Sequence, residues 1–425
     1  MFRWITFSIR NSLSPLSSDT LPAYLSAHLP DDILPGGTPE SWQTEEVGDG
    51  NLNLVFIVRG SERTLVVKQS LPYVRAAGES WELSLQRNYF EYHALSQEKR
   101  FAPDSVPDVY FYDEAMALFA MEYLADHIIL RKALIAGEYV PHLAEKTGLF
   151  MAQTLFHTSD IGMAAQEKKA LTAQFSANHE LCKITEDLIF TEPYFPAPRN
   201  NHTSPQLDRD ANAVMLDREM VQVAMRYKYK FMTQSQALLH GDLHSGSVMI
   251  GTDSVQVIDP EFSFMGPMAF DTGNYAGNLY MAWFSQPGHR KTEEETARYQ
   301  QWLLSQISQT WNTFETEFRR LWAEKSQGDA WPRELYQDGL FDDKFLKAAQ
   351  DSFFAELFQD TLVNAGLEIN RRLLGFAGVA DFKTIADADK RAALERKALK
   401  LARELIVNAR HYHSFADVEA FLSYC

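Results

Sequence analysis

The tripeptide His240-Gly241-Asp242 carries the clearest chemical pattern in the chain. An apolar stretch leads into it and Gly241 allows a tight turn, so Asp242 would be presented on a loop between two rigid elements. Phosphoryl transfer to a hydroxyl group requires an oriented nucleophile and an acceptor for its proton. Asp242 suits that role, and an ordinary polar turn is the alternative.

A zinc site is a second interpretation of the same segment, because His240 and His244 are four residues apart, as in helical zinc sites. Gly241 and Gly246 disfavour a helix, however, and the segment lacks the glutamate of the H-E-x-x-H pattern. The pattern therefore favours a catalytic turn over a metal site.

Asp259 and Glu261 follow an apolar run and begin 17 residues after Asp242. If strand geometry continues through them, residues two apart point to the same side. Paired carboxylates suit Mg²⁺, which binds through one or two carboxylates together with nucleotide phosphates. The alternative is a charged strand end before a loop.

Gly48 and Gly50 precede a strand-like segment near the N-terminus. Two glycines at this spacing expose backbone N–H groups and let phosphate oxygens approach the backbone closely. Asn53 stands where the kinase pattern G-x-G-x-x-G has its third glycine. A plain β-turn is the alternative.

Lys68 closes an apolar segment 18 residues after Gly50, the position from which a kinase lysine reaches the α- and β-phosphates. Glu91 on the following helix would hold its ammonium group, whereas a snorkelling lysine and a solvated glutamate are the alternative. Glycine turn, lysine, glutamate, His-Gly-Asp and acidic pair follow one another as they do in kinases. This order predicts a kinase-like phosphotransferase.

The elements that must position these residues change in character along the chain. Short β-branched runs predict two hairpins, at 54–58 with 64–68 and at 109–112 with 115–121, and a helix over 80–99 between them. Further on, helices are predicted over 143–157, 217–236, 292–325, 345–374 and 390–411, with one hairpin at 247–250 and 255–258. The pattern predicts an α+β chain with a small β-rich lobe and a large, mainly helical lobe.

Composition excludes several classes of protein. The 425 residues include 40 Lys and Arg against 57 Asp and Glu, a net charge of -17 that disfavours nucleic-acid and anionic-membrane partners. No segment approaches the ~20 apolar residues that cross a bilayer. The two cysteines, Cys182 and Cys425, predict free thiols in a reducing compartment. We therefore expect a cytoplasmic protein, in which a phosphate-bearing ligand needs a local cluster of positive charge.

Three segments resemble 5-methylthioribose kinases, members of the aminoglycoside phosphotransferase and choline kinase-like group. They are residues 47–56, residues 68–75 running on to 79–81, and residues 240–247. The two cousin families usually carry Asn where this chain has Ser247, and that Asn would ligate a metal. Together with the pair Asp259 and Glu261, Ser247 points to methylthioribose kinases. The resemblance covers about residues 45 to 410.

The resemblance implies a protein-kinase-like bilobal fold, with a nucleotide-binding lobe at 1–123 and a catalytic and substrate-binding lobe at 124–425. It implies transfer of phosphate from ATP, with Mg²⁺, to the anomeric hydroxyl of 5-methylthioribose in methionine salvage, by a homodimer. By matching position, the resemblance implies contacts to the ATP phosphates for Gly50, Asn53 and Lys68, and a hinge that holds adenine for Glu122, Tyr123 and Leu124. It implies that Asp242 is the sugar ligand and the base, and that Asp259, Pro260 and Glu261 contact the nucleotide and the metal. It also implies sugar and phosphate contacts for Arg371 and Arg372, and a loop near the active site for Trp81.

Some features depart from that family or leave other functions open. Tyr123 stands where related sequences carry Asp, which puts a side-chain contact to ribose in doubt, and Pro260 removes a backbone donor. Adjacent helical residues point about 100° apart, so we expect only one of Arg371 and Arg372 to reach the sugar directly. A kinase for another small alcohol, such as choline, homoserine or an aminoglycoside, and an inactive nucleotide-binding scaffold are the alternatives.

Overall fold

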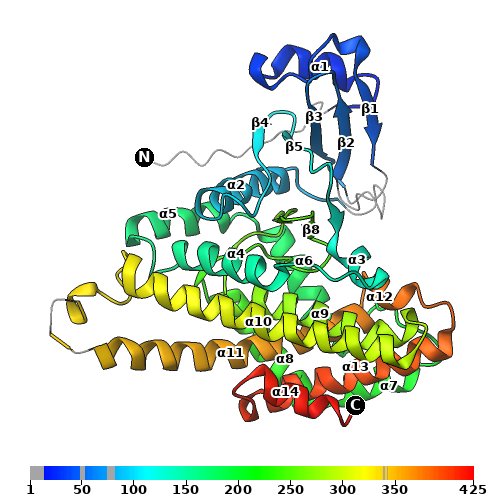
Figure 1. The fold of residues 1–425 in the computed structure, drawn as a ribbon, viewed down its shortest axis with the longest axis vertical. Helices are drawn as coiled ribbons and strands as arrows, with labels where there is room; N and C mark the ends of the chain where they lie inside the picture. The colour runs from blue at the N-terminus through cyan, green and yellow to red at the C-terminus, as the bar shows by residue number, and fades with distance from the viewer. Residues whose placement is uncertain (1–13, 48–52, 74–81, 338–339, 342) are drawn as a thin grey trace. The chain divides into compact units, whose positions relative to one another are not determined.

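The computed structural model describes residues 14–47, 53–73, 82–337, 340–341 and 343–425 (Figure 1). The chain divides into two compact units. The first comprises Met1–Tyr92 and Asp108–Leu124, and the second comprises His93–Pro107 and Ala125–Cys425.

The first unit is built on a five-stranded antiparallel sheet. Its strand order is β1 (Gln43–Glu46), β2 (Asn53–Arg59), β3 (Thr64–Ser70), β5 (Leu118–Glu122) and β4 (Val109–Asp113). Both predicted hairpins are confirmed, since β2 pairs with β3 and β4 pairs with β5. Strand β1 was not predicted, because its sequence, QTEE, is short and polar.

One face of this sheet forms the core of the first unit. Phe56, Val58, Leu65 and Val67 are fully buried and pack with the helix α1 (Leu21–His28). Fully burying a side chain of this size contributes about 1.5–3 kcal/mol, so the alternation of apolar residues along β2 and β3 fixes the register of the hairpin. Helix α2 (Gln86–Phe101) then follows, beginning six residues after the predicted start.

The second unit is mainly helical. Its helices are α3 (Leu130–Ala136), α4 (Leu143–His157), α5 (Ala165–Phe175), α6 (His179–Leu188), α7 (Asp208–Leu216), α8 (Arg218–Thr233), α9 (Ala269–His289), α10 (Glu293–Lys325), α11 (Asp343–Leu374), α12 (Ala380–Lys383), α13 (Ala388–Asn408) and α14 (Phe415–Leu422). The five helices predicted in this region are confirmed as α4, α8, α10, α11 and α13, with small differences at their ends. Helix α10 packs on α4 and α9, and α11 packs on α9 and α13 (Figure 1).

Short strands in the second unit frame the His-Gly-Asp segment. They are β6 (Ile128–Ile129), β7 (Ala237–Leu238), β8 (Val248–Ile250), β9 (Val255–Val257) and β10 (Met265–Gly266). The predicted hairpin of β8 and β9 is confirmed, and β6 pairs with β8 while β10 pairs with β7. The fold is therefore the expected α+β arrangement of a small sheet and a large helical part.

Helix α9 was not predicted, although it is 21 residues long. Almost every residue from Ala269 to Gln286 is buried, so the sequence shows no amphipathic stripe. Gly273 lies so close to α11 that a Cβ there would collide with the Cβ of Asn364. Small residues thus let α9 and α11 approach closely, and α9 brings polar side chains beneath the His-Gly-Asp segment.

Two further features concern the cysteines and the helices. Cys182 and Cys425 are both free. Among the described residues, none of the helices combines the length and the apolar character that crossing a membrane requires.

Candidate active site

The turn after β7 is fixed by its glycine and by a buried acid. Gly241 has φ 83°, and a Cβ there would collide with the carbonyl oxygen of Phe262, so only glycine fits. The carboxylate of Asp271, in the first turn of α9, accepts the backbone N–H groups of His240 (2.7 Å) and Gly241 (3.0 Å). Asp271 therefore clamps the turn that presents Asp242.

Asp271 was missed at the sequence level, because the helix that carries it was missed. Burial raises the pKa of this carboxyl to about 6, although the two backbone hydrogen bonds act in the opposite direction. Had α9 been predicted, an aspartate in its first turn, shortly after the His-Gly-Asp segment, would have indicated Asp271 as a candidate site residue.

His240 has both ring nitrogens engaged in the local fold. The N–H of Asp242 donates to its Nδ1 (3.2 Å), so Nε2 is the donor to the carbonyl oxygen of Ile258 (2.9 Å). The zinc interpretation, already disfavoured, has no support from this geometry. His240 serves instead to tie the His-Gly-Asp turn to the chain that leaves β9.

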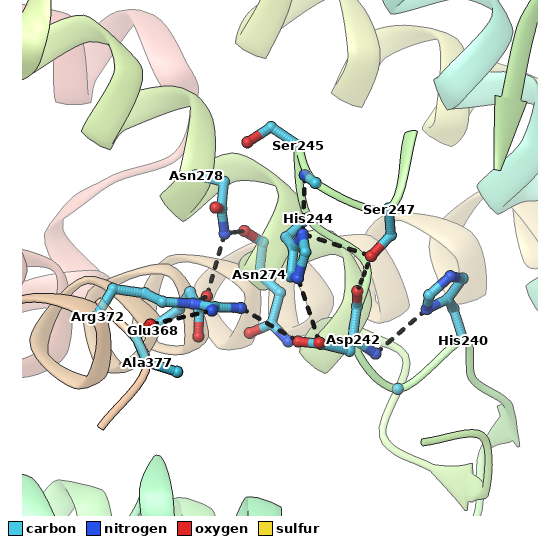
Figure 2. Close-up of polar contacts among 12 residues, drawn as sticks. His240, Asp242, His244, Ser245, Ser247, Asn274, Asn278, Glu368, Arg372 and Ala377 are labelled. Atoms are coloured by element: carbon cyan, nitrogen blue, oxygen red, sulfur yellow. Dashed lines mark hydrogen bonds and ion pairs between the residues drawn. The ribbon is translucent and has the colours of Figure 1, made fainter. Parts of the chain in front are cut away.

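Asp242 lies among three donors, of which Figure 2 labels His244 and Arg372. Its Oδ2 is 3.2 Å from Nε2 of His244, and its Oδ1 is 3.3 Å from a terminal nitrogen of Arg372 and 4.0 Å from one of Arg371. The side chain is one quarter exposed. Burial raises the pKa of Asp242, but His244 and the two arginines outweigh burial and hold it well below its usual value. The carboxylate is therefore ionised and still accessible.

His244 acts as a neutral donor to Asp242. Its Nδ1 accepts the N–H of Gly246 (2.8 Å), which leaves the proton on Nε2, toward the carboxylate. Burial lowers the pKa of His244 to about 4, despite the neighbouring charge of Asp242. The hydroxyl of Ser247 donates to the carbonyl oxygen of Asp242 (2.9 Å) and closes the loop (Figure 2).

Helix α11 brings a buried acid and two arginines to this loop. Oε1 of Glu368 lies 2.6 Å from Nε of Arg372 and 3.6 Å from a terminal nitrogen of Arg371. Among the described residues, Nε and one terminal nitrogen of Arg371 find no hydrogen-bond partner. Both guanidinium groups face Asp242, so the structure brings the two arginines together with the candidate base.

The acidic pair does not lie on a strand, and the strand argument for it was wrong. Strand β9 ends at Val257, and Asp259 has φ 71°, a left-handed conformation that is costly for a residue other than glycine. Glu261 is buried, and its backbone oxygen accepts from Nδ2 of Asn178 (3.0 Å). Pro260 accepts the N–H of Ser263 (3.1 Å). The pair thus sits on a strained, well-anchored loop, whose oxygen donors fit a hard divalent cation.

In the first unit, the predicted ion pair of Lys68 and Glu91 is confirmed. Both side chains are almost fully buried, and Lys68 on β3 donates to Oε1 of Glu91 on α2. Nearby, Oδ1 of Asn53 accepts from Oγ of Ser70 (2.9 Å) and from Nε of Arg87 (3.0 Å). Gly50 and Trp81 lie outside the described residues.

The predicted hinge follows the end of β5. The N–H of Glu122 donates to the carbonyl oxygen of Asp108 (2.8 Å), and its side chain accepts the N–H of Asp108 (3.1 Å). The guanidinium of Arg59 lies 5.8 Å from the ring centroid of Tyr123. These contacts tie Glu122 and Tyr123 to the sheet just before Leu124, where the first unit ends.

Comparison with known proteins gives consistent results. The sequence profile of the "Phosphotransferase enzyme family" matches residues 43–311. "Methylthioribose kinase" of Escherichia coli is 60% identical over 97% of this chain and 98% of its own length. "Methylthioribose kinase 1" of Oryza sativa subsp. japonica is 42% identical over 95% of this chain and 94% of its own. "Methylthioribose kinase" of Yersinia pseudotuberculosis is 40% identical over 88% and 89%.

Proposed function

We propose that this chain, which belongs to the methylthioribose kinase family, transfers the γ-phosphoryl group of ATP to the anomeric hydroxyl of 5-methylthioribose in methionine salvage. The products are 5-methylthioribose 1-phosphate and ADP. The observation that carries the proposal is the partly exposed carboxyl group of Asp242, held between His244 and the arginine pair.

Asp242 serves as the sugar ligand and the proton acceptor. The anomeric oxygen forms a bond to the γ-phosphorus while the bond between that phosphorus and ADP breaks, and the hydroxyl proton passes to Asp242. A carboxylate can accept this proton only when it is ionised, and its depressed pKa keeps it so at neutral pH. His244, by donating to Oδ2, holds the carboxylate plane.

The arginine pair supplies positive charge to the sugar and the transferring phosphate. Among the described residues, Nε and one terminal nitrogen of Arg371 lack a hydrogen bond, which supports a ligand role for this residue, because buried donors are normally hydrogen-bonded. Arg372 is more fully engaged by Glu368, Asp242 and the carbonyl oxygen of Ala377. A guanidinium group at the transferring phosphate is worth ~10³-fold or more where an arginine finger serves.

Asp259 and Glu261 are the residues that would hold Mg²⁺. Bound there, the ion would neutralise charge on the nucleotide phosphates. Two carboxylates on one anchored loop fit the preference of Mg²⁺ for a few protein oxygens. The left-handed conformation of Asp259 supports this role, since such strain is concentrated at functional sites.

The nucleotide contacts are assigned by position in the first unit. Lys68, held by Glu91, and Asn53 and Gly50 contact the phosphates of ATP. The hinge of Glu122, Tyr123 and Leu124 holds adenine through backbone groups. The N–H of Glu122 is already bonded to Asp108, so its contribution would be its carbonyl oxygen.

Two broader features are also part of the proposal. Residues 1–123 act as the nucleotide-binding lobe and residues 124–425 as the catalytic and substrate-binding lobe. The enzyme is a cytoplasmic homodimer, which light scattering on the purified protein would test by returning twice the monomer mass.

A substrate panel tests the proposed reaction. ADP release is measured with methylthioribose, choline, homoserine and an aminoglycoside, with Asp242→Asn as the blank. A strong preference for methylthioribose is expected, and equal rates with choline would contradict the assignment.

A further inference from the structure

We propose that Arg131, on α3, is a positioning residue that holds the loop of Asp242 and His244 against the helices bearing the arginine pair. The inference rests on the proposed phosphotransferase function and adds to it a residue that motif matching did not select. Arg131 does not touch Asp242 in this arrangement. It reaches Asp242 through two separate chains of hydrogen bonds.

The first chain runs along the catalytic loop. The backbone N–H of Arg131 donates to the carbonyl oxygen of Ser245 (2.9 Å), and its Nε donates to Oγ of the same residue (3.1 Å). Ser245 lies between His244 and Gly246, whose N–H fixes the ring of His244. Arg131 therefore anchors the segment that directs the Nε2 proton of His244 at Asp242.

The second chain runs through α9 and α11. A terminal nitrogen of Arg131 donates to Oδ1 of Asn278 (2.7 Å), and Nδ2 of Asn278 donates to Oε1 of Glu368 (3.1 Å). The same Glu368 oxygen binds Arg372, which contacts Asp242 (Figure 2). The side-chain amide of Asn278 therefore links Arg131 to Glu368, and Glu368 in turn binds Arg372.

A third contact explains why Arg131 can be buried. Its Nε lies 3.1 Å from Oδ2 of Asp381 on α12, a side chain that is 2% exposed. The buried charges then alternate in sign, with three cations and three carboxylates: Arg131, Arg371, Arg372, Asp242, Glu368 and Asp381. Balanced pairing offsets the cost of removing each charge from water.

The competing interpretation is that Arg131 merely neutralises Asp381. In that case its loss would lower stability and leave the turnover of the folded enzyme unchanged. A positioning role instead predicts a lower kcat with little change in the KM for ATP, because Arg131 belongs to the loop that positions the base.

The test compares Arg131→Lys, Arg131→Met and the control Arg319→Met in the full-length enzyme. Arg319 also makes paired side-chain contacts, to Glu315 and Asp351, but it joins α10 to α11 away from the loop. We expect Arg131→Met to lower kcat about tenfold or more, with the KM for ATP within about threefold of the wild type. The kcat of Arg131→Lys should lie between those of Arg131→Met and the wild type, because a lysine ammonium keeps the charge but not the planar arrangement of donors of a guanidinium. Arg319→Met should keep both constants.

Two further variants keep the inference testable if Arg131→Met does not fold. Ser245→Ala removes the side-chain contact of the first chain, and Asn278→Ala removes the second chain. Both variants leave the ion pair of Arg131 with Asp381 in place. Each should lower kcat about threefold or more in a protein with a wild-type circular dichroism spectrum.

The inference is overturned if a folded Arg131→Met enzyme keeps kcat within about twofold, or if both Ser245→Ala and Asn278→Ala do so. Failure of the proposed function would look different, because the wild-type enzyme would then not turn over methylthioribose. The same kcat ratios, measured on whichever alcohol the substrate panel identifies, would still decide the role of Arg131.

Discussion

Asp242 keeps its negative charge although only one quarter of its side chain is exposed. Burial raises the pKa of Asp242, whereas the Nε2 proton of His244, Arg372 and Arg371 lower it and favour the carboxylate. Because burial also lowers the pKa of His244 to about 4, the imidazole stays neutral at pH 7. Of Asp242 and His244, the carboxylate of Asp242 is therefore the group that can accept a substrate proton at pH 7, through lone pairs that its neighbours do not use.

Replacing Asp242 with Asn tests its role as the base. The amide keeps the shape of the side chain but cannot accept the hydroxyl proton, so kcat should fall by about 10³-fold or more. Binding of a non-hydrolysable ATP analogue, measured by calorimetry, should be unchanged. Asp253→Asn, in the exposed turn between β8 and β9, is the matched control. An active Asp242→Asn enzyme would remove Asp242 from this role.

The two arginines of α11 should differ in what their loss does. Arg371→Met removes a side chain whose Nε and one terminal nitrogen lack hydrogen bonds to the described residues and whose ion pairs with Glu368 (3.6 Å) and Asp242 (4.0 Å) are longer than those of Arg372. We therefore expect kcat/KM for methylthioribose to fall about 100-fold, with a smaller change in Tm than in Arg372→Met. Arg372→Met breaks a buried pair with Glu368, which costs about 3–5 kcal/mol of the free energy of unfolding. Steady-state kinetics and thermal melts separate the effects. The same large loss of Tm in both variants would contradict this division.

At the scale of elements, amphipathic patterns predicted the helices that have one apolar and one polar face. Helices α4, α10, α11 and α13 each turn an apolar face to the core, and all four were predicted from their periodicity. Helix α9 is buried on every side, so its sequence has no polar face to reveal the period. Asp271 and Asn278 were missed with it, because their roles depend on where α9 lies.

The acidic pair shows a limit of a different kind. The residue types of Asp259 and Glu261 predicted an oxygen-rich site, but the strand geometry assumed for them was wrong. A left-handed φ at Asp259 depends on contacts of the surrounding loop and leaves no local signal in an Asp-Pro-Glu sequence. Arg131 was missed for a similar reason, since three of its partners lie more than 100 positions away in the chain: Ser245, Asn278 and Asp381.

Asp271 predicts a defined pH dependence of stability. Its pKa of about 6 in the folded protein exceeds the value of about 3.9 in an unfolded chain, so folding favours its protonated form. Its contribution to the free energy of unfolding is therefore full below about pH 4 and is lost as the pH rises through about 6.

Thermal melts of the wild type and Asp271→Asn measure this contribution. The Tm of the wild type relative to Asp271→Asn should fall between about pH 4 and pH 6 and then stay constant. Asp253→Asn should show no such trend. A Tm difference that grows in favour of the wild type over this range would contradict the raised pKa.

The ion pair between β3 and α2 makes a prediction for nucleotide binding. Lys68→Met removes the only cation that the resemblance assigns to the ATP phosphates in the first unit, so we expect the KM for ATP to rise about tenfold or more. Glu91→Gln should have a smaller effect of the same sign, because the lysine remains but is less firmly held.

Arg100→Met is the control for this pair, since Arg100 forms a mostly exposed ion pair with Glu167. Exposed pairs contribute about 0–1 kcal/mol, so its kinetic constants should match those of the wild type. Unchanged ATP kinetics in Lys68→Met would show that Lys68 serves only the fold.

At the scale of the whole molecule, a chain of net charge -17 gathers buried positive charge where the proposed reaction needs it. Arg131, Arg371 and Arg372 lie around the candidate base, and Lys68 lies in the sheet unit. The fold class and the family were predicted from the sequence and are both confirmed. Both predictions rest on the order of motifs along the chain, which does not depend on where each helix ends. It could not predict the hydrogen-bond chains, which arise only when distant segments pack.

Identification of the product by correlated proton and phosphorus NMR tests the central claim most directly. The purified enzyme is incubated with ATP, Mg²⁺ and methylthioribose, with Asp242→Asn as the blank. The account predicts one new phosphomonoester whose phosphorus couples to the anomeric proton of the sugar. A phosphorus coupled to another sugar proton, or release of ADP without any phosphorylated sugar, would contradict it.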